Sequence, residues 1–535
     1  MKTIYYGGPI ITMENESAAP EAVLVDDASG VIEGVGPLAA LERMGGESAV
    51  KEDLEGKCLM PAFIDAHSHI TMNGQMAMCA DLSSCETFED IIRTLRLLIE
   101  KRGIGENQAV MGFGYDQNFL KEQHHPDKYL LDMVSQEIPI MILHISGHLA
   151  CVNTAALRLA DITKNTPDPQ GGIIGRLENG EPSGYLEEAG VVLLQEPIQS
   201  RLHVDWGIIL GSLQKDYIEN GVTTVQDGAT SKESFGLLER MAADGKLIVD
   251  VVAYPLMSAD GETIIRKNKE RVRDYKNHLK IGGYKLILDG SPQGRSAWMS
   301  EPYLGGEAGY CGYPWMGDET VRMFIKQAVD EGQQILVHCN GDAASEQFIN
   351  AYEWALKKSD NPDKNRLRPV MIHCQTVRND QLSRMAALNM IASIFVGHVW
   401  YWGDIHMKNF GTVRGNHISP VKDAIDRGVT VNFHQDTPVT KPNMLLSVWC
   451  AVNRKSRGGK QIGDDQKVSV YEALKAVTIN GAYQYFEESR KGSIKTGKRA
   501  DLVILDRSPL DVAPEAIKDI QVVRTIKDGR VIFNR

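Results

Sequence analysis

The sequence lacks the features of secreted, membrane and nucleic-acid-binding proteins. Its 535 residues include eight cysteines but no Cys-x-x-Cys pair, so the cysteines do not form a disulfide framework. No apolar run is long enough to span a membrane, and the first residues lack the apolar core of a secretory signal. The net charge of −12 argues against nucleic acid as a partner. We therefore expect a cytoplasmic protein that binds neither membranes nor nucleic acid.

Short apolar runs alternate with helical patterns through the middle of the chain. Helix-period segments, such as 318–331 and 345–358, separate most of these runs. Almost entirely apolar strands that alternate with helices are typical of a parallel sheet covered on both faces. Eight such strands predict an α/β fold with a (β/α)₈ TIM barrel. The candidate strands are 58–69, 221–228, 247–256, 281–290, 333–342, 369–375, 390–398 and 429–436.

The predicted barrel contains one large insertion. About 150 residues separate the first two candidate strands, whereas a βα unit needs only about 30. We predict an inserted α/β subdomain at 73–205, with an amphipathic helix at 88–102 and a hairpin turn at Asn179-Gly180. The insertion begins at the end of a barrel strand, on the face that carries the active site in barrel enzymes. It is therefore a candidate lid.

The two ends of the chain have a different pattern from the middle. Both show short strands broken by turns, and an Asp-Gly hairpin signal lies near the C-terminus. We predict that 1–60 and 485–535 together form one small β-sandwich domain, which leaves 61–484 for the barrel.

Polar side chains stand on several candidate strands, mostly at their ends. Imidazoles and carboxylates are the usual ligands of Zn²⁺, and a bound metal lowers the pKa of its water to about 7. A nearby carboxylate can then move a proton from that water to a leaving group. Each residue alone has a structural alternative, as a hydrogen-bonded histidine, a buried ion pair or a helix cap, but together they predict a metal site. The residues are His67, His69, Lys285, His338, His373 and Asp436.

The chain resembles the amidohydrolase superfamily, and within it the branch that contains N-substituted formamide deformylase. The resemblance runs over nearly the whole sequence. Two segments are specific to the superfamily, Pro61-Ala-Phe-Ile-Asp-Ala-His-Ser-His69 and Gly497-Lys-Arg-Ala-Asp-Leu-Val-Ile-Leu505. Three are specific to the branch, Gly114-Tyr-Asp-Gln-Asn118, Ser146-Gly-His-Leu-Ala-Cys-Val-Asn153 and Lys285-Leu-Ile-Leu-Asp-Gly290.

The resemblance implies roles for the predicted ligands. His67, His69 and Asp436 match ligands of a buried metal, and Asp436 also matches the general base and acid. His338 and His373 match ligands of a second ion. Lys285 matches a lysine that carries a CO₂-derived carbamate between the two ions. Zinc is the expected metal, with Mn, Fe or Ni as alternatives, and a one-metal site remains open.

Further residues are candidates for the substrate pocket. His148 matches a position that faces the site and polarises a substrate carbonyl. Asp116 and Gln117 are candidates to line the pocket, Arg295 to bind an anionic group, and His398 to form part of an aromatic wall. The branch usually has Ala-Leu-Gly-Ser-Arg where this chain has Ser-Pro-Gln-Gly-Arg, which leaves the substrate open.

We interpret the chain as a metal-dependent hydrolase of a small molecule. Metal-bound hydroxide attacks an amide or formamide carbonyl, and Asp436 transfers the proton. A deaminase, an ester or lactone hydrolase and a non-catalytic regulatory or ligand-binding protein are the alternatives. A homodimer is the expected assembly, because this is the commonest oligomer.

Overall fold

The computed structural model describes residues 1–202, 209 and 211–535, which divide into two compact units. The first unit comprises Met1–Thr71, Gln214–Leu288 and Asp318–Arg535, and the second comprises Met72–Leu213 and Asp289–Gly317. The predicted end of the insertion, at residue 205, lies outside the described residues. The sequence did not indicate that the segment after the fourth candidate strand belongs with the insertion.

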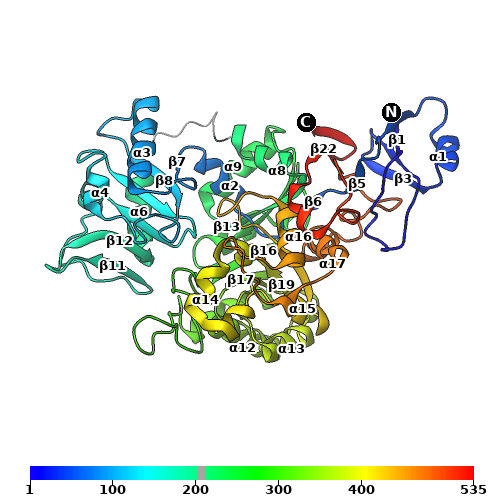
Figure 1. Ribbon diagram of the computed structural model, residues 1–535. Helices are drawn as coiled ribbons and strands as arrows, with labels where there is room; N and C mark the ends of the chain where they lie inside the picture. Colours follow the sequence, from blue (N-terminus) through cyan, green and yellow to red (C-terminus); the bar gives the residue numbers. More distant parts are fainter. Residues whose placement is uncertain (203–208, 210) are drawn as a thin grey trace. The chain divides into compact units, whose positions relative to one another are not determined.

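Parallel strands form the centre of the first unit (Figure 1). They are β6 (Phe63–Ile64), β13 (Val222–Thr230), β14 (Asp250–Pro255), β15 (Leu279–Ile281), β16 (Gly283–Ile287), β17 (Gln334–Cys339), β18 (Val370–His373), β19 (Ile391–Ile394) and β20 (Thr430–Phe433). The strands form two sheets, ordered β15-β14-β13-β6 and β16-β17-β18-β19-β20. Nearly all their residues are buried, as apolar strands covered on both faces should be.

Helices follow most of these strands and cover the sheets. The two predicted helical segments are present as α11 (Asp318–Asp330) and α12 (Asp342–Lys358), and both pack against β17. In α11 the buried residues Val321, Ile325 and Ala328 recur at the helical period. The other helices are α8 (Lys215–Glu219), α9 (Lys232–Ala243), α10 (Gly261–Lys267), α13 (Asn379–Ala387), α14 (His398–Asn416), α15 (Val421–Asp426), α16 (Met444–Asn453), α17 (Val470–Ala476) and α18 (Ile479–Gln484).

The first candidate strand, 58–69, is not a single strand. Its beginning, β5 (Cys58–Pro61), pairs antiparallel with β21 (Leu502–Leu505), whereas β6 pairs parallel with β13. A segment that serves two sheets has to break between them, and it does so at Ala62. Beyond β6, Asp436 N donates to His67 O at 3.2 Å and His69 N donates to Thr437 O at 2.8 Å. These bonds join the segments that follow the first and last parallel strands.

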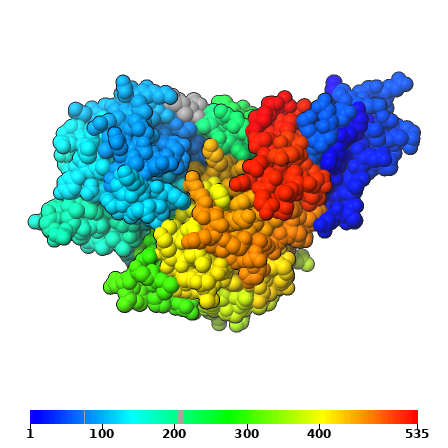
Figure 2. Space-filling view, viewed as in Figure 1, coloured from blue at the N-terminus to red at the C-terminus, as the bar shows by residue number. Residues whose placement is uncertain are grey.

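The two ends of the chain form two small sheets that share a core. Their orders are β3-β2-β1-β4 and β23-β22-β21-β5, with β1 (Lys2–Tyr6), β2 (Ala22–Asp26), β3 (Val31–Gly36), β4 (Val50–Asp53), β22 (Val522–Lys527) and β23 (Arg530–Asn534), and with α1 (Leu38–Gly45) beside the first sheet. Tyr5 and Val23 from the first sheet pack in one cluster with Leu502 and Ile526 from the second. Figure 2 shows the C-terminal strands, in red, against the N-terminal segment, in blue.

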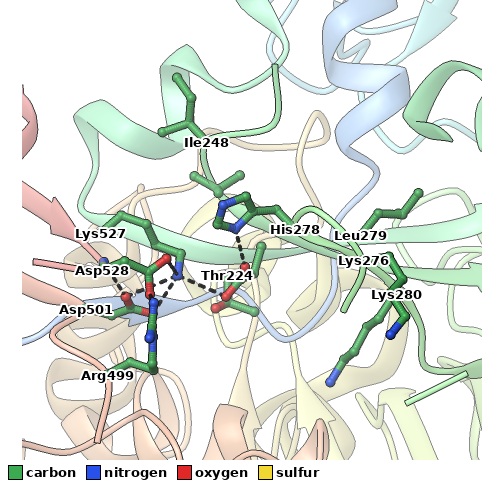
Figure 3. A network of polar contacts seen from close by, with 12 residues as sticks. Thr224, Ile248, Lys276, His278, Leu279, Lys280, Arg499, Asp501, Lys527 and Asp528 are labelled. Atoms are coloured by element: carbon green, nitrogen blue, oxygen red, sulfur yellow. Dashed lines mark hydrogen bonds and ion pairs between the residues drawn. The ribbon is translucent and has the colours of Figure 1, made fainter. Parts of the chain in front are cut away.

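A buried network of charges links the C-terminal strands to the parallel strands (Figure 3). Lys527, at the end of β22, lies 3.1 Å from Asp250 on β14 and 3.2 Å from Asp501. Asp250 also binds Lys491 and accepts a hydrogen bond of 2.7 Å from Nδ1 of His278. The Lys527, Lys491, Asp250 and Asp501 side chains are at most 9% exposed. Since a buried charge without a partner is costly, these ion pairs hold β22 to β14.

We expect Lys527→Met to destabilise the protein by about 3–5 kcal/mol, because buried Asp501 loses its lysine partner and Asp250 loses one of two. Thermal and urea unfolding measure the loss. The matched control is Lys422→Met, whose ion pair with Asp426 is 44% and 50% exposed and contributes at most about 1 kcal/mol. Equal melting temperatures for the two variants would show that the network does not stabilise the fold.

The second unit is built on one six-stranded mixed sheet, ordered β11-β12-β10-β9-β8-β7. The predicted helix is α3 (Phe88–Arg102), which begins at a Thr87–Asp90 capping box and ends at left-handed Gly103. The predicted hairpin joins β11 and β12. The remaining bounds are β7 (Ala80–Asp81), β8 (Val110–Tyr115), β9 (Ile140–His144), β10 (Leu149–Val152), β11 (Gly172–Arg176), β12 (Pro182–Glu188), α4 (Lys128–Asp132), α5 (Thr154–Leu159) and α6 (Ala189–Gln199). Helix α2 (Ile70–Met76) spans the boundary between the units.

All eight cysteines are free thiols, in agreement with the prediction that they form no disulfide framework. Among the helices that the structure describes, none combines the length and the hydropathy of a membrane-spanning segment.

Candidate metal centre

The predicted ligands lie on the parallel strands or just beyond their C-terminal ends. Lys285 and His338 lie within β16 and β17, and His373 is the last residue of β18. His67 and His69 lie after the end of β6, where the chain bends, and not on a strand that continues to residue 69 as predicted. Their segment leaves the sheet because its backbone hydrogen-bonds to the residues after β20.

His67, His69 and Asp436 converge on one point. Oδ1 of Asp436 lies 3.4 Å from Nε2 of His67 and 3.2 Å from Nε2 of His69. The three ligand atoms lie within 4.8 Å of one another. Within the described part of the chain, these residues are the one group of three His, Cys, Asp or Glu side chains close enough to hold a metal ion.

Hydrogen bonds on the far side of each imidazole determine which nitrogen carries the proton. Nδ1 of His67 lies 2.5 Å from Oε1 of Gln226, and Nδ1 of His69 contacts the carbonyl oxygen of Gly228. The Gln226 amide is itself oriented, because its Nε2 donates to Ala66 O at 2.9 Å. Each Nδ1 therefore carries a hydrogen, which leaves a lone pair on each Nε2. Two lone pairs and a carboxylate oxygen that face one another repel unless a cation lies between them, so the residues fit a metal ion.

The electrostatics of the group favour the forms that bind metals, which are neutral imidazole and ionised carboxylate. Burial, assisted by the charge of Lys285, lowers the pKa of His67 well below its usual value. Burial also lowers the pKa of His373. Burial alone would raise the pKa of Asp436, but the contact with His69 and the other imidazoles hold it well below its usual range.

A second group of candidate ligands lies beside the first. Nδ1 of His338 is 3.1 Å from Nε2 of His373, and that Nε2 is 3.9 Å from Oδ2 of Asp436. Nζ of Lys285 is 3.2 Å from Nε2 of His67. Burial lowers the pKa of Lys285 to about 7, against the opposing effect of Asp436. Burial therefore favours the neutral amine, which is the form that can act as a nucleophile.

Two of these residues have strained backbones. His373 has a φ of 69° and Asp436 a φ of 55°, in the left-handed region that side chains with a Cβ rarely adopt. Such strain costs about 1–3 kcal/mol at each position and persists where the surroundings hold the residue in place. The two strained residues belong to the two ligand groups, so the strain coincides with the candidate site.

Gly228 makes room for the His67 ring, and we expect Gly228→Ala to weaken metal binding by about 10–100-fold. A Cβ at this position would lie 2.6 Å from Cε1 of His67 and 3.0 Å from Nδ1, so the imidazole would have to leave its Gln226 partner. Competition with a chromophoric chelator measures the affinity. Gly236→Ala is the control, because a Cβ there meets only Arg240, at 3.8 Å. Unchanged affinity in Gly228→Ala would contradict the assigned ring position.

The remaining predicted residues, except His398, belong to the second unit. Nδ1 of His148 donates to Oε2 of buried Glu188 at 2.8 Å. Asp116 accepts from Asn118 and lies 3.5 Å from Nε2 of His144. Arg295 donates to Gly305 O at 3.3 Å, and the buried Oε1 of Gln117 has no hydrogen-bond partner among the described residues.

His398 begins α14 in the first unit and is 4% exposed. Its ring centroid lies 4.5 Å from that of Phe395 and 5.3 Å from that of Trp402. His373 is farther away, at 6.0 Å between ring centroids. His398 thus packs among aromatic side chains, and its predicted contact with substrate remains a hypothesis.

Two residues that contact the candidate ligands were not predicted from the sequence. His434 lies between Ser393 and His373, and Gln226 orients His67. Both had a signal in the sequence, since His434 stands two residues before Asp436 and Gln226 is a polar residue in an apolar strand. Glu188, the partner of His148, had no such signal.

Known proteins resemble this chain over nearly its whole length. It is 28% identical to putative amidohydrolase YtcJ of Bacillus subtilis, with both chains fully covered. It is 29% identical to N-substituted formamide deformylase of Arthrobacter pascens, covering 98% of this chain and 97% of the relative. An uncharacterised metal-dependent hydrolase from Pyrococcus horikoshii has a similar fold, with a TM-score of 0.76, 24% identity and coverage of 96% and 99%.

The profile of the amidohydrolase family matches residues 52–533. This range includes all the candidate ligands, the whole second unit and most of the first. The match and the full-length relatives confirm the predicted resemblance and the prediction of an enzyme of this class. The chain belongs to the amidohydrolase family.

Proposed function

We propose that this chain is a metal-dependent hydrolase that cleaves an amide or formamide C–N bond in a small molecule. The observation that carries the proposal is the convergence of two imidazole lone pairs, from His67 and His69, on a carboxylate oxygen of Asp436. The 29% sequence identity to a formamide deformylase, over nearly the whole chain, supports a carbonyl attached to nitrogen as the reacting group.

We propose that the two parallel sheets are parts of one (β/α)₈ barrel. The backbone hydrogen bonds between the segments after β6 and β20 support closure on one side, and a parallel bridge between Leu256 and Lys285 supports it on the other.

The shared core of the terminal sheets supports a composite domain of 1–60 and 485–535. We propose the insertion at 73–205 as the lid.

Zinc is the proposed metal, because imidazoles with a carboxylate are its usual ligands. His67, His69 and Asp436 would hold one ion. His338, His373 and Lys285 would hold a second, with Lys285 as its CO₂-derived carbamate. A free ammonium beside a dication would be repelled, whereas a carbamate offers anionic oxygens. The burial of Lys285 beside His67 supports this role.

A metal ion held by these residues would acidify a water molecule and polarise the substrate carbonyl. Asp436 would take a proton from the attacking water as the water oxygen forms a bond to the carbonyl carbon. Asp436 then delivers the proton to the nitrogen as the C–N bond breaks, so that a carboxylic acid and an amine leave. Its Oδ1 and Oδ2 face the two groups of ligands, which suits this exchange.

His148 is the proposed partner of the substrate carbonyl oxygen. Its Nδ1 is held by Glu188, whose side chain is buried. A carboxylate behind an imidazole fixes the orientation of the ring, so that its other nitrogen can face a substrate oxygen. The position of His148 in the branch-specific segment Ser146–Asn153 supports the assignment.

A substrate screen with metal-loaded enzyme tests the proposal. N-formyl and N-acyl amines, hydantoins, lactones, esters and amino-heterocycles would be offered to wild type and to His67→Ala. We expect acid and amine products from an amide or formamide, with ¹⁸O from labelled water in the acid, and no turnover by the variant. Release of ammonia from amino-heterocycles alone would indicate a deaminase, and cleavage of lactones or esters alone would indicate that C–O bonds are the target.

A further inference from the structure

His434 contacts His373 and is not one of the three converging residues His67, His69 and Asp436. It follows β20 and is completely buried, as is Ser393 on β19. Nε2 of His434 is 3.2 Å from Nδ1 of His373, and Nδ1 of His434 is 2.9 Å from Oγ of Ser393. Both nitrogens of His434 thus have a polar partner, His373 and Ser393.

These contacts form a directed chain of hydrogen bonds. The face of His373 that carries Nε2 points to His338 and Asp436. For that Nε2 to offer a lone pair, Nδ1 of His373 must carry the hydrogen and needs an acceptor. Nε2 of His434 is that acceptor, and Nδ1 of His434 then donates to Ser393.

Packing holds the His434 ring in this orientation. Its centroid lies 5.1 Å from that of His373, 5.2 Å from that of His67 and 5.5 Å from that of Phe395. Rings on three sides leave little space for rotation. His434 therefore acts on His373 in the way that Gln226 acts on His67.

We propose that His434 is a positioning residue, which accepts a hydrogen bond from Nδ1 of His373 and so presents Nε2 of His373 to the second metal ion. This inference rests on the proposed function, in which His373 binds that ion. In this role His434 does not touch the metal ion. It fixes the orientation and the tautomer of His373, which does.

The affinity for the second ion tests the inference. Wild type, His434→Phe, His434→Gln and His373→Ala would be titrated with Zn²⁺ against a chromophoric chelator, and the visible spectrum of each Co²⁺-loaded protein would be recorded. We expect His434→Phe to weaken the second ion by about 10–100-fold without affecting the first. His434→Gln should stay close to wild type, because its amide oxygen can accept the same bond. His406→Phe, which replaces another buried histidine, is the control for loss of a buried imidazole.

The outcomes separate the inference from the proposed function. Normal affinity in His434→Phe, together with loss of one ion in His373→Ala, would overturn the inference alone. Loss of the second ion in both His434→Phe and His434→Gln would overturn the inference, because it would indicate that His434 itself binds the ion. Two ions in His373→Ala would contradict the two-metal site itself.

A second measurement needs no substitution. Nitrogen-15 NMR of the imidazoles in metal-free wild type should show the hydrogen on Nδ1 of both His373 and His434. A hydrogen on Nε2 of His373 would overturn the inference even if His434→Phe did not fold.

Discussion

Replacing Asp436 with asparagine is expected to lower kcat by about 10²–10⁴-fold, the usual contribution of a general acid–base group. The amide cannot take a proton from the attacking water, although it is close to the carboxylate in shape. Both oxygens of the native side chain face imidazoles, so the variant should also hold its metal less tightly. The measurement is steady-state turnover of the substrate that the screen identifies, at saturating metal.

The control for this experiment is Asp426→Asn, since Asp426 lies at the end of α15 in an exposed ion pair. It should leave kcat unchanged. A kcat within threefold of wild type in metal-saturated Asp436→Asn would remove Asp436 from proton transfer and leave it as a ligand only.

Replacing Lys285 with alanine is expected to remove most of the activity and one of the two bound ions. The amine is buried beside His67, and its carbamate is the proposed bridge between the ligand groups. Short-chain carboxylic acids should restore part of the activity, because a free carboxylate can occupy the space and offer the missing oxygens. Metal analysis and turnover with and without acetate measure both effects.

A second buried lysine distinguishes loss of the bridge from general damage. Lys280 lies on β15, which precedes β16 in the chain, and its ion pair is with Glu487 rather than with a candidate ligand. Lys280→Met should destabilise the fold yet keep the metal content of wild type. Equal metal content in Lys285→Ala and wild type would contradict the bridging role.

The sequence was most informative where apolar strands end in polar residues. A buried parallel strand has to be apolar, so a His or Asp at its end stands out, and His338, His373 and Asp436 could be located in this way. The spacing of His67 and His69 was also visible, although the reason for their convergence was not. They meet because the chain leaves β6 and hydrogen-bonds beside β20, a long-range contact that local patterns do not contain.

Features set by tertiary contacts could not be read from the sequence. The run 58–69 is uniformly apolar, yet it serves two sheets, because β5 pairs with a strand more than 400 residues away. The orientation of His67 depends on Gln226, and that of His373 depends on His434, and neither pair is close in the chain. The membership of Asp289–Gly317 in the second unit likewise follows from packing rather than from periodicity.

The metal content of purified protein tests the central claim most directly. Inductively coupled plasma mass spectrometry would count the ions in wild type and in His67→Ala after growth with added zinc and extensive dialysis. We predict about one or two tightly bound divalent transition-metal ions per wild-type chain, since such sites hold their ions strongly, and a clear loss in His67→Ala. Fewer than one ion in wild type, with the same value in the variant, would contradict the account.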